Sequence, residues 1–472
     1  MIFELAKCAA SLAAIFLAGG AVYFMVIGKA DRRWSEAIAY GWGAGVVLLY
    51  VIGGLLVRIP PLFFKWHLYC LGLLVLLAVA PAAFYIRENR LSGLRFPRTN
   101  LSARRIDLRA AGMLACLALH TLLLAWISLN RPVFDSDAIN PRRWVGLAKA
   151  IYRLGGLPAS VRVWNPAFPS LVPLWPNMFT ARWYDSMAGV PWVCFYVLTL
   201  LISGQFIYRV TGSLKAGLAY ACVLASIPLM WNHVIRPGFS DLIVCYFMAA
   251  VLSLLYYSYQ YRQRRYFLFS LVFMLGACMS KQEAVGWMLL IYAACGLLYW
   301  HVKRQRPVAL ILGIEGIVIT AGLATHLLFA DFFHDLIAGR FLYLGLLFRN
   351  RFDPAALRLL VERTFTWATF GVYWYLVLGI LVYILIRPGT TFVRLLGAQC
   401  ALAYLLILYF LCGTGNVSHT ISGTNASRLL LQWVPLGGVL YAVFVSRVLR
   451  GGSGPARNAK RFALSDPGQG EH

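Results

Sequence analysis

Charged side chains are scarce in this sequence, and acidic ones are the scarcest. Of its 472 residues 13% are charged, with 17 Asp and Glu against 43 Lys and Arg. Soluble domains carry about 25% charged residues, and about half of their residues are apolar, whereas 61% of this chain is hydrophobic. The composition therefore excludes a soluble, disordered or fibrous protein and predicts a polytopic membrane protein.

Disulfide and metal-ligand patterns are lacking as well. The ten cysteines lie almost all within apolar runs, where cysteine behaves as a small hydrophobic residue. The histidines show no zinc-ligand spacing with cysteines or carboxylates. The sequence therefore predicts neither a disulfide scaffold nor a structural metal site.

Positive charge is what the chain has in excess, with a formal net charge of +26 at pH 7. In a soluble protein this excess would indicate nucleic acid as a partner. Between membrane spans, Lys and Arg bind lipid phosphates and mark the cytoplasmic face. We therefore expect membrane lipids as partners and no nucleic acid.

Apolar runs long enough to cross a bilayer recur along the chain. Scanning for about 20 apolar residues predicts about thirteen spans and an all-α, polytopic helical bundle. The expected spans are 5–27, 37–57, 66–86, 107–128, 188–209, 214–231, 238–259, 266–280, 284–301, 308–330, 366–386, 392–412 and 428–449. Residues 1–450 are then one transmembrane domain, and residues 451–472 are a basic, disordered cytoplasmic tail.

The basic residues predict which loops face the cytoplasm. Alternate loops carry basic clusters, at 32–33, 87–105, 262–265, 303–306 and from 447 onward. Because Lys and Arg are retained in cytoplasmic loops, the other loops are expected on the outer face. Two of these outer loops are long, at 129–187 and 331–365. The outer loops also hold most of the acidic residues, so we expect the chemistry on that side.

The first outer loop begins with two carboxylates, Asp135 and Asp137, directly after the fourth expected span. Side chains two residues apart point in different directions in both strand and helix, so the pair is expected to divide its roles. One carboxylate would act as general base, and the other would orient a hydroxyl or help to hold Mg or Mn. A turn or helix-capping pair is the competing interpretation.

The rest of this loop predicts an interfacial helix and a rigid segment. Apolar residues recur at helical spacing between 144 and 154, opposite basic residues that include Lys149. Three prolines within 165–174 are expected to prevent regular helix there.

Several short motifs occur in one order along the outer face. They are Asp137-Ala138, Ala-Lys-Ala-Ile-Tyr at 148–152, Phe-Pro-Ser-Leu-Val-Pro at 168–173, Gly-Phe-Ser-Asp at 238–241, Ser-Lys-Gln-Glu-Ala at 280–284 and Asn-Ala-Ser-Arg-Leu-Leu-Leu at 425–431. Together they resemble the motifs of GT-C glycosyltransferases, in particular bacterial aminoarabinose transferases and protein O-mannosyltransferases. Gln282 and Ala284 stand where that family has Asn and Gly.

The resemblance implies inverting transfer of a sugar from a polyprenyl phosphate to a glycan, lipid or protein acceptor. The site would face the periplasm from a bacterial cytoplasmic membrane. Asp137 would be the general base, helped by Asp135 and Asp241. Cations at the outer ends of spans would hold the donor phosphate, with Glu283 and His419 in support; these cations are Lys281, Arg428 and Lys149.

Other interpretations stay open. Asp241 follows Pro237 and Gly238 and could be only a helix cap, while Lys281 and Arg428 could extend to the interface to reach water. His233 is expected as a loop or core histidine. For the whole chain, the alternatives are an O-antigen ligase or polymerase, which the arginines of loop 331–365 would suit, and a lipid or solute transporter.

Overall fold

The structure is a computed structural model. It describes residues 2–27, 33–56, 107–130, 144–154, 168–180, 182–281, 283–289, 291–292, 295, 353–386 and 426–449. The secondary structure in these ranges is entirely helical. The all-α class is therefore confirmed for the part of the chain that the structure describes.

The described helices form two sets. Those that run along the bundle are α1 (Ile2–Val26), α2 (Trp34–Leu56), α4 (Leu108–Asn130), α8 (Asp185–Thr211), α9 (Leu214–Ala225), α11 (Asp241–Tyr261), α12 (Arg264–Ser280), α18 (Tyr373–Ile386) and α21 (Ala426–Leu449). The others, called the short helices below, are α6 (Trp144–Leu154), the 3-10 turn η2 (Phe168–Ser170), α7 (Leu171–Asn177), α10 (Pro228–Ile235), α16 (Pro354–Phe365) and α17 (Trp367–Phe370).

Six of the described helices are long and apolar enough to cross a membrane, namely α1, α2, α4, α8, α11 and α21. The protein is thus a membrane-embedded helical bundle. The expected total of about thirteen spans is not confirmed. The runs at 66–86, 308–330 and 392–412 lie outside the described residues, and α12 has only 17 residues where about 20 are needed.

The span expected at 214–231 is wrong as a single straight helix. α9 and α10 are separated by a short break and bent by 64°. The cause is Pro228, which has no N–H to continue the hydrogen-bond ladder and forces the preceding residue out of helical geometry. Ile227 accordingly has φ −74° and ψ 110°. The two segments together count as one broken span or a re-entrant segment.

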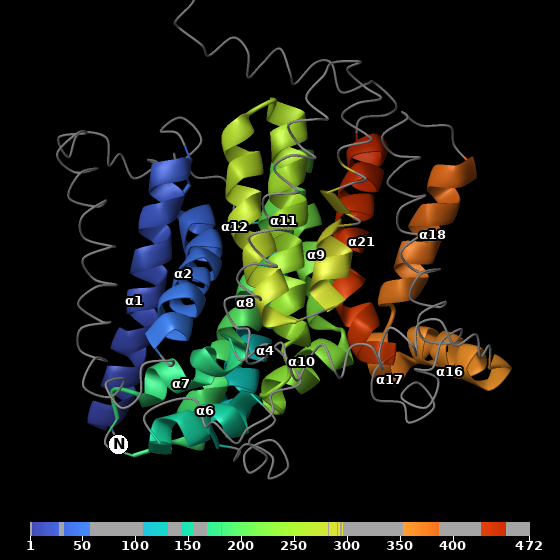
Figure 1. Cartoon of the computed structure of the whole chain (residues 1–472). Coiled ribbons are helices and arrows are strands. Elements are labelled where there is room, and N and C mark those ends of the chain that lie inside the picture. The colour runs from blue at the N-terminus through green and yellow to red at the C-terminus, as the bar shows by residue number, and fades with distance from the viewer. Residues whose placement is uncertain are drawn as a thin grey trace, which may run out of the picture.

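The short helices gather at one end of the bundle. In Figure 1, α6, α7, α10, α16 and α17 lie together at the lower end, and the basic turn between α11 and α12 lies at the upper end. A salt bridge of 2.5 Å between Lys215 Nζ and Asp107 Oδ2 shows that the start of α9 lies beside the start of α4. This arrangement agrees with the predicted alternation of loops; which end faces outward stays a prediction.

The segment expected as the first outer loop contains the predicted helix and an unexpected one. α6 spans 144–154, as the spacing predicts, and is buried against the protein over residues 144–148 and at Ile151. The expectation that the prolines prevent helix is wrong from Leu171 onward, because α7 contains Pro173 and Pro176. Pro173 is tolerated because it stands in the first turn, where backbone N–H groups have no partner within the helix.

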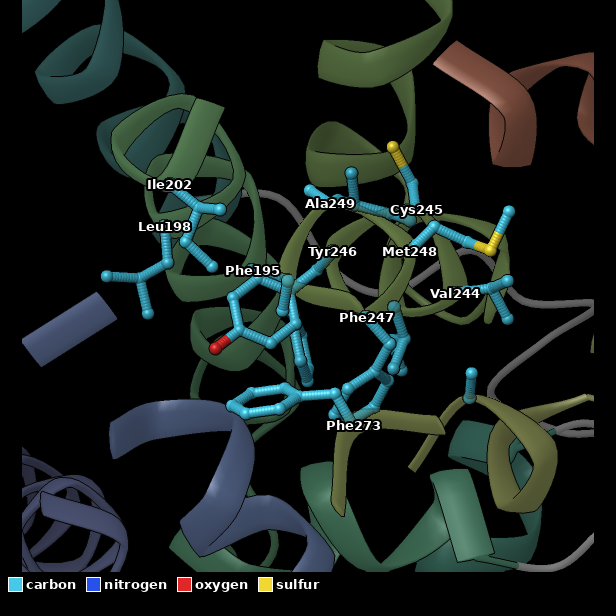
Figure 2. Close-up of a cluster of buried hydrophobic side chains, with 14 of the residues drawn as sticks. Phe195, Leu198, Ile202, Val244, Cys245, Tyr246, Phe247, Met248, Ala249 and Phe273 are labelled. Carbon is cyan, nitrogen blue, oxygen red and sulfur yellow. The ribbon is translucent and has the colours of Figure 1, made fainter. Parts of the chain in front are cut away.

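α11 lies in the middle of the described bundle and packs against α8, α12 and α21. Figure 2 shows aromatic side chains of α8, α11 and α12 in this core, where Phe195 and Tyr246 are 5.3 Å apart by ring centroids. The Tyr246 hydroxyl also forms hydrogen bonds with two backbone groups of α2. It accepts from the Gly43 N–H at 2.9 Å and donates to the Ala39 carbonyl at 2.5 Å. α2 and α11 are thus joined by backbone-directed hydrogen bonds.

A buried ion pair joins α2 to α8 at the end opposite the short helices. Arg209 donates to both carboxylate oxygens of Glu36, at 2.8 and 3.0 Å, and to the Tyr266 hydroxyl at 2.8 Å. Its guanidinium also lies 4.4 Å from the ring centre of Tyr257. Glu36 is only 2% exposed. Aromatic rings and an arginine therefore compensate its burial.

α1 and α2 touch backbone to backbone through glycines. A Cβ added at Gly19 would lie 1.8 Å from the Gly41 carbonyl oxygen, and one added at Gly45 would lie 2.0 Å from the Ile15 carbonyl oxygen. Small residues at such spacing let membrane helices approach closely, which maximises their dispersion contacts. The contact therefore depends on the absence of side chains at these positions.

We expect Gly19→Ala to destabilise the protein by about 1–3 kcal/mol, because the new methyl group meets backbone that cannot move aside. Gly20→Ala is the matched control, since a Cβ at Gly20 meets nothing within 4 Å. Thermal unfolding of the purified variants in detergent measures the difference. Equal melting temperatures for the two variants would refute the close contact.

Candidate functional site

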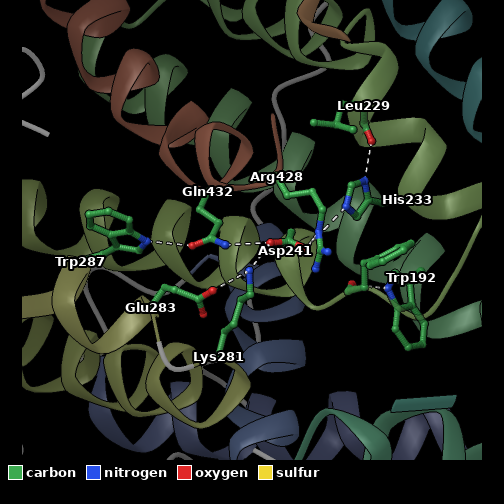
Figure 3. Close-up of polar contacts among 10 residues, drawn as sticks. Trp192, Leu229, His233, Asp241, Lys281, Glu283, Trp287, Arg428 and Gln432 are labelled. Carbon is green, nitrogen blue, oxygen red and sulfur yellow. Dashed lines mark hydrogen bonds and ion pairs between the residues drawn. The ribbon is translucent and has the colours of Figure 1, made fainter. Parts of the chain in front are cut away.

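The candidate site is centred on Asp241, the first residue of α11. Its side chain is fully buried. It is placed there by the turn between α10 and α11, in which Gly238 adopts φ 126°, a conformation that other residues rarely take. Figure 3 shows side chains from α10, from α21 and from the end of α12 pointing toward this one carboxylate.

Two cations bind Asp241 from different helices. Lys281, at the end of α12, places its Nζ 2.7 Å from Oδ1, and Arg428, in the first turn of α21, donates from Nε to Oδ2 at 2.7 Å. The Lys281 side chain is 7% exposed and that of Arg428 is 17% exposed. Charges buried this far need close partners, because desolvation costs several kcal/mol for each ion.

The amide of Gln432 and the indole of Trp287 extend the hydrogen-bond network from Oδ1 of Asp241. Gln432 donates from Nε2 to Oδ1 of Asp241 at 2.8 Å, and Trp287 donates from Nε1 to Oε1 of Gln432 at 2.9 Å. Because an indole N–H can only donate, it fixes the amide with its oxygen toward Trp287. The orientation of Gln432 follows from this network.

His233 of α10 lies on the other side of Asp241. Its Nε2 is 3.8 Å from Oδ2, beyond hydrogen-bond distance, while its Nδ1 lies 2.7 Å from the Leu229 carbonyl oxygen. The Phe239 ring contacts both His233 and Arg428: it meets the His233 ring edge to face, with centroids 5.5 Å apart, and its centre lies 4.5 Å from the Arg428 guanidinium. Its carbonyl accepts from the Trp192 indole at 2.9 Å, which holds the turn in place.

Donors outnumber acceptors around the two cations. A guanidinium has five N–H groups and an ammonium has three. Within the described residues, the terminal nitrogens of Arg428 make no hydrogen bond, since only Nε is engaged. Glu283, whose side chain is 35% exposed, lies 3.4 Å from Lys281. The arrangement can therefore still donate several hydrogen bonds to an anion.

The predicted site residues separate into three groups. Asp241, Lys281, Arg428 and Glu283 come together, although they are far apart in sequence. Lys149 takes part in a different ion pair, 3.6 Å from Asp185. Asp135, Asp137 and His419 lie outside the described residues.

Sequence reasoning missed three members of this cluster, namely His233, Gln432 and Trp287. Gln432 follows Arg428 by one helical turn, so it shares a helix face with it, and this spacing was a usable signal. Nothing in the sequence indicated His233, because only the turn at 236–240 brings it back to Asp241.

No metal ligand set is found among the described residues. In those ranges, no group of three or more His, Cys, Asp or Glu side chains is arranged to hold a metal ion. The predicted Mg or Mn would involve Asp135 and Asp137, which the described ranges do not include.

Comparison with known proteins gives no relative for this chain. No family model matches it, and neither the curated proteins nor the solved structures contain a significant match.

We expect Asp241→Asn to lower the free energy of unfolding by about 3–5 kcal/mol, because it leaves two buried cations without their counter-ion. Asp185→Asn is the control, since that carboxylate is 30% exposed in its pair with Lys149 and such a pair contributes about 0–1 kcal/mol. Thermal unfolding in detergent compares the two. Similar losses in both variants would contradict the buried network.

Proposed function

We propose that the protein is a membrane glycosyltransferase that moves a sugar from a polyprenyl phosphate to an acceptor at the membrane surface. The observation that carries the proposal is the pair Lys281 and Arg428, which meet at Asp241 beside unused hydrogen-bond donors. A lipid phosphate leaving group needs such donors, since arginine binds phosphate through two parallel N–H groups and lysine supplies a compact charge.

The position of the cluster in the bundle supports a lipid-linked substrate. The helix starts that carry Asp241 and Arg428 lie at the end where the short helices gather (Figure 1). Amphipathic α6 belongs to this set, and helices of this kind lie in the headgroup layer. A phosphate attached to a membrane lipid is held at the same depth.

Asp241 is assigned a holding role in this proposal. Its Oδ1 accepts from Lys281 and Gln432, and its Oδ2 accepts from Arg428. A carboxylate that stabilises two buried cations in this way is a poor proton acceptor, because protonation would remove their counter-charge. Asp241 therefore positions the cations and is not the general base.

The general base is proposed to be Asp137, with Asp135 orienting the acceptor hydroxyl. In the inverting reaction, the acceptor oxygen forms a bond to the anomeric carbon as the bond from that carbon to the phosphate oxygen breaks. The acceptor proton passes to the Asp137 carboxylate, and the polyprenyl phosphate leaves against Lys281 and Arg428. Direct displacement of this kind uses one base and cationic stabilisation of the leaving group.

A transporter is the second candidate, because α9 and α10 form a broken span bent by 64°. Transporters use broken helices around a site at the bilayer midplane. Here α10 lies with the short helices at one end of the bundle (Figure 1), which favours a surface reaction. Uptake of a labelled solute into proteoliposomes without sugar transfer would favour transport instead.

We expect Arg428→Lys to weaken donor binding by about tenfold. The substitution keeps one positive charge for Asp241 but removes the planar fork that binds phosphate. Arg358→Lys on the exposed face of α16 is the matched control, with unchanged binding. Binding of a radiolabelled prenyl-phosphoryl sugar to purified protein measures both. If the two variants bind the donor with equal affinity, Arg428 does not contribute to donor binding.

We expect Asp137→Asn to reduce transfer by about 10²–10⁴-fold, the usual contribution of a general base. Expression and donor binding should match the wild type, because the phosphate-binding cations are unchanged. The assay follows release of prenyl phosphate from a prenyl-phosphoryl sugar in reconstituted membranes. Full turnover by this variant would show that Asp137 is not the general base.

A further inference from the structure

His233 presents a buried nitrogen that has no hydrogen-bond partner. The residue is 4% exposed, and its Nε2 makes no hydrogen bond within the described structure. A buried polar atom without a partner is uncommon, because its desolvation is uncompensated. The atom lies 3.8 Å from Oδ2 of Asp241, on the side where Arg428 approaches. Figure 3 shows the imidazole pointing into the cluster.

The tautomer of this imidazole follows from its other nitrogen. A carbonyl oxygen only accepts, so Nδ1 carries the proton that it donates to Leu229 at 2.7 Å. In the neutral imidazole one nitrogen donates and the other accepts, so with the proton on Nδ1 the lone pair is on Nε2. Nε2 of this tautomer is a hydrogen-bond acceptor.

Because Nε2 of His233 can only accept a hydrogen bond, its partner must be a hydrogen-bond donor. Ionised phosphate oxygens are themselves acceptors, so they cannot satisfy Nε2, whereas a hydroxyl group can donate to it. Oγ of Ser240, the residue before Asp241 in sequence, is also buried and has no hydrogen-bond partner among the described residues. The site thus combines cationic donors with unsatisfied groups that suit hydroxyls.

We infer that Nε2 of His233 accepts a hydrogen bond from a hydroxyl of the sugar that is attached to the bound phosphate. The inference rests on the proposed function and makes His233 a residue that recognises the sugar, next to the cations that hold its phosphate. Phe239, in contact with both His233 and Arg428, fixes the spacing between the two groups.

Two probes of equal charge separate recognition of the sugar from recognition of the phosphate. Farnesyl-phosphoryl-mannose carries the sugar, and farnesyl methyl phosphate carries only a methyl group on the same phosphodiester. The wild type should bind the mannose probe more tightly. His233→Asn keeps a donor for the Leu229 carbonyl but removes Nε2, while His233→Gln restores a polar group near the Nε2 position.

We expect His233→Asn to weaken binding of the mannose probe by roughly threefold to tenfold, the contribution of one net hydrogen bond. Its affinity for the methyl probe should be unchanged, and His233→Gln should recover most of the loss. An equal loss for both probes, or no loss for either, would overturn the inference. Equal affinity of the wild type for the two probes would also overturn the inference. This comparison needs no variant, so it holds even if a His233 variant does not fold.

Failure of the proposed function gives a different result. If wild-type protein binds neither probe, no prenyl phosphate site exists and both proposals fall together. If it binds both probes and Arg428→Lys weakens both, the phosphate site stands, and the His233 variants alone decide whether this residue recognises the sugar.

Discussion

The described bundle depends on one buried carboxylate, because Asp241 is the point at which α11, α12 and α21 are joined. Burying Asp241, Lys281 and Arg428 separately would cost several kcal/mol for each ion. The cost is offset only when all three meet at hydrogen-bond distance, as they do at 2.7 Å. This requirement fixes the relative positions of three helix ends. A phosphate held by the two cations, as proposed, would be positioned by the same requirement.

Two buried ion clusters in the described part of the bundle depend on the same physics but differ in how their arginines are used. At Glu36, both carboxylate oxygens accept from Arg209, whose guanidinium is enclosed by tyrosine rings. Within the described residues both clusters leave a buried polar atom without a hydrogen-bond partner, Oη of Tyr257 at the first and Nε2 of His233 at the second. The arginines differ: the terminal nitrogens of Arg209 donate to Glu36 and Tyr266, whereas Arg428 donates to Asp241 through Nε alone. The remaining N–H groups of Arg428 therefore favour an anion at Asp241 and a structural role at Glu36.

Much of the fold could be predicted from single stretches of sequence. Apolar runs marked the long helices, and the spacing of residues 144–154 marked α6. Lys281, Glu283 and Arg428 were identifiable because charges at the ends of apolar runs are costly. Their meeting at Asp241 was not predictable, since it depends on how helices distant in sequence pack. The predictions of an unbroken span through Pro228 and of no helix around Pro173 were wrong for a related reason. Whether a proline disrupts a helix depends on its position within the turn, and the sequence did not show where the turns begin.

The separation of donors and acceptors around Asp241 limits which ligands the site can satisfy. The cations and the amide of Gln432 supply N–H groups, whereas His233 supplies a lone pair. A simple anion would satisfy the first set and leave Nε2 unpaired, whereas a neutral polyol could pair with both sets but would bring no negative charge to the two cations. A ligand with a phosphate and a hydroxyl a few ångströms apart satisfies both sets at once. Because an unsatisfied buried group costs more than a made hydrogen bond contributes, this pairing discriminates against ligands that carry only one of the two groups.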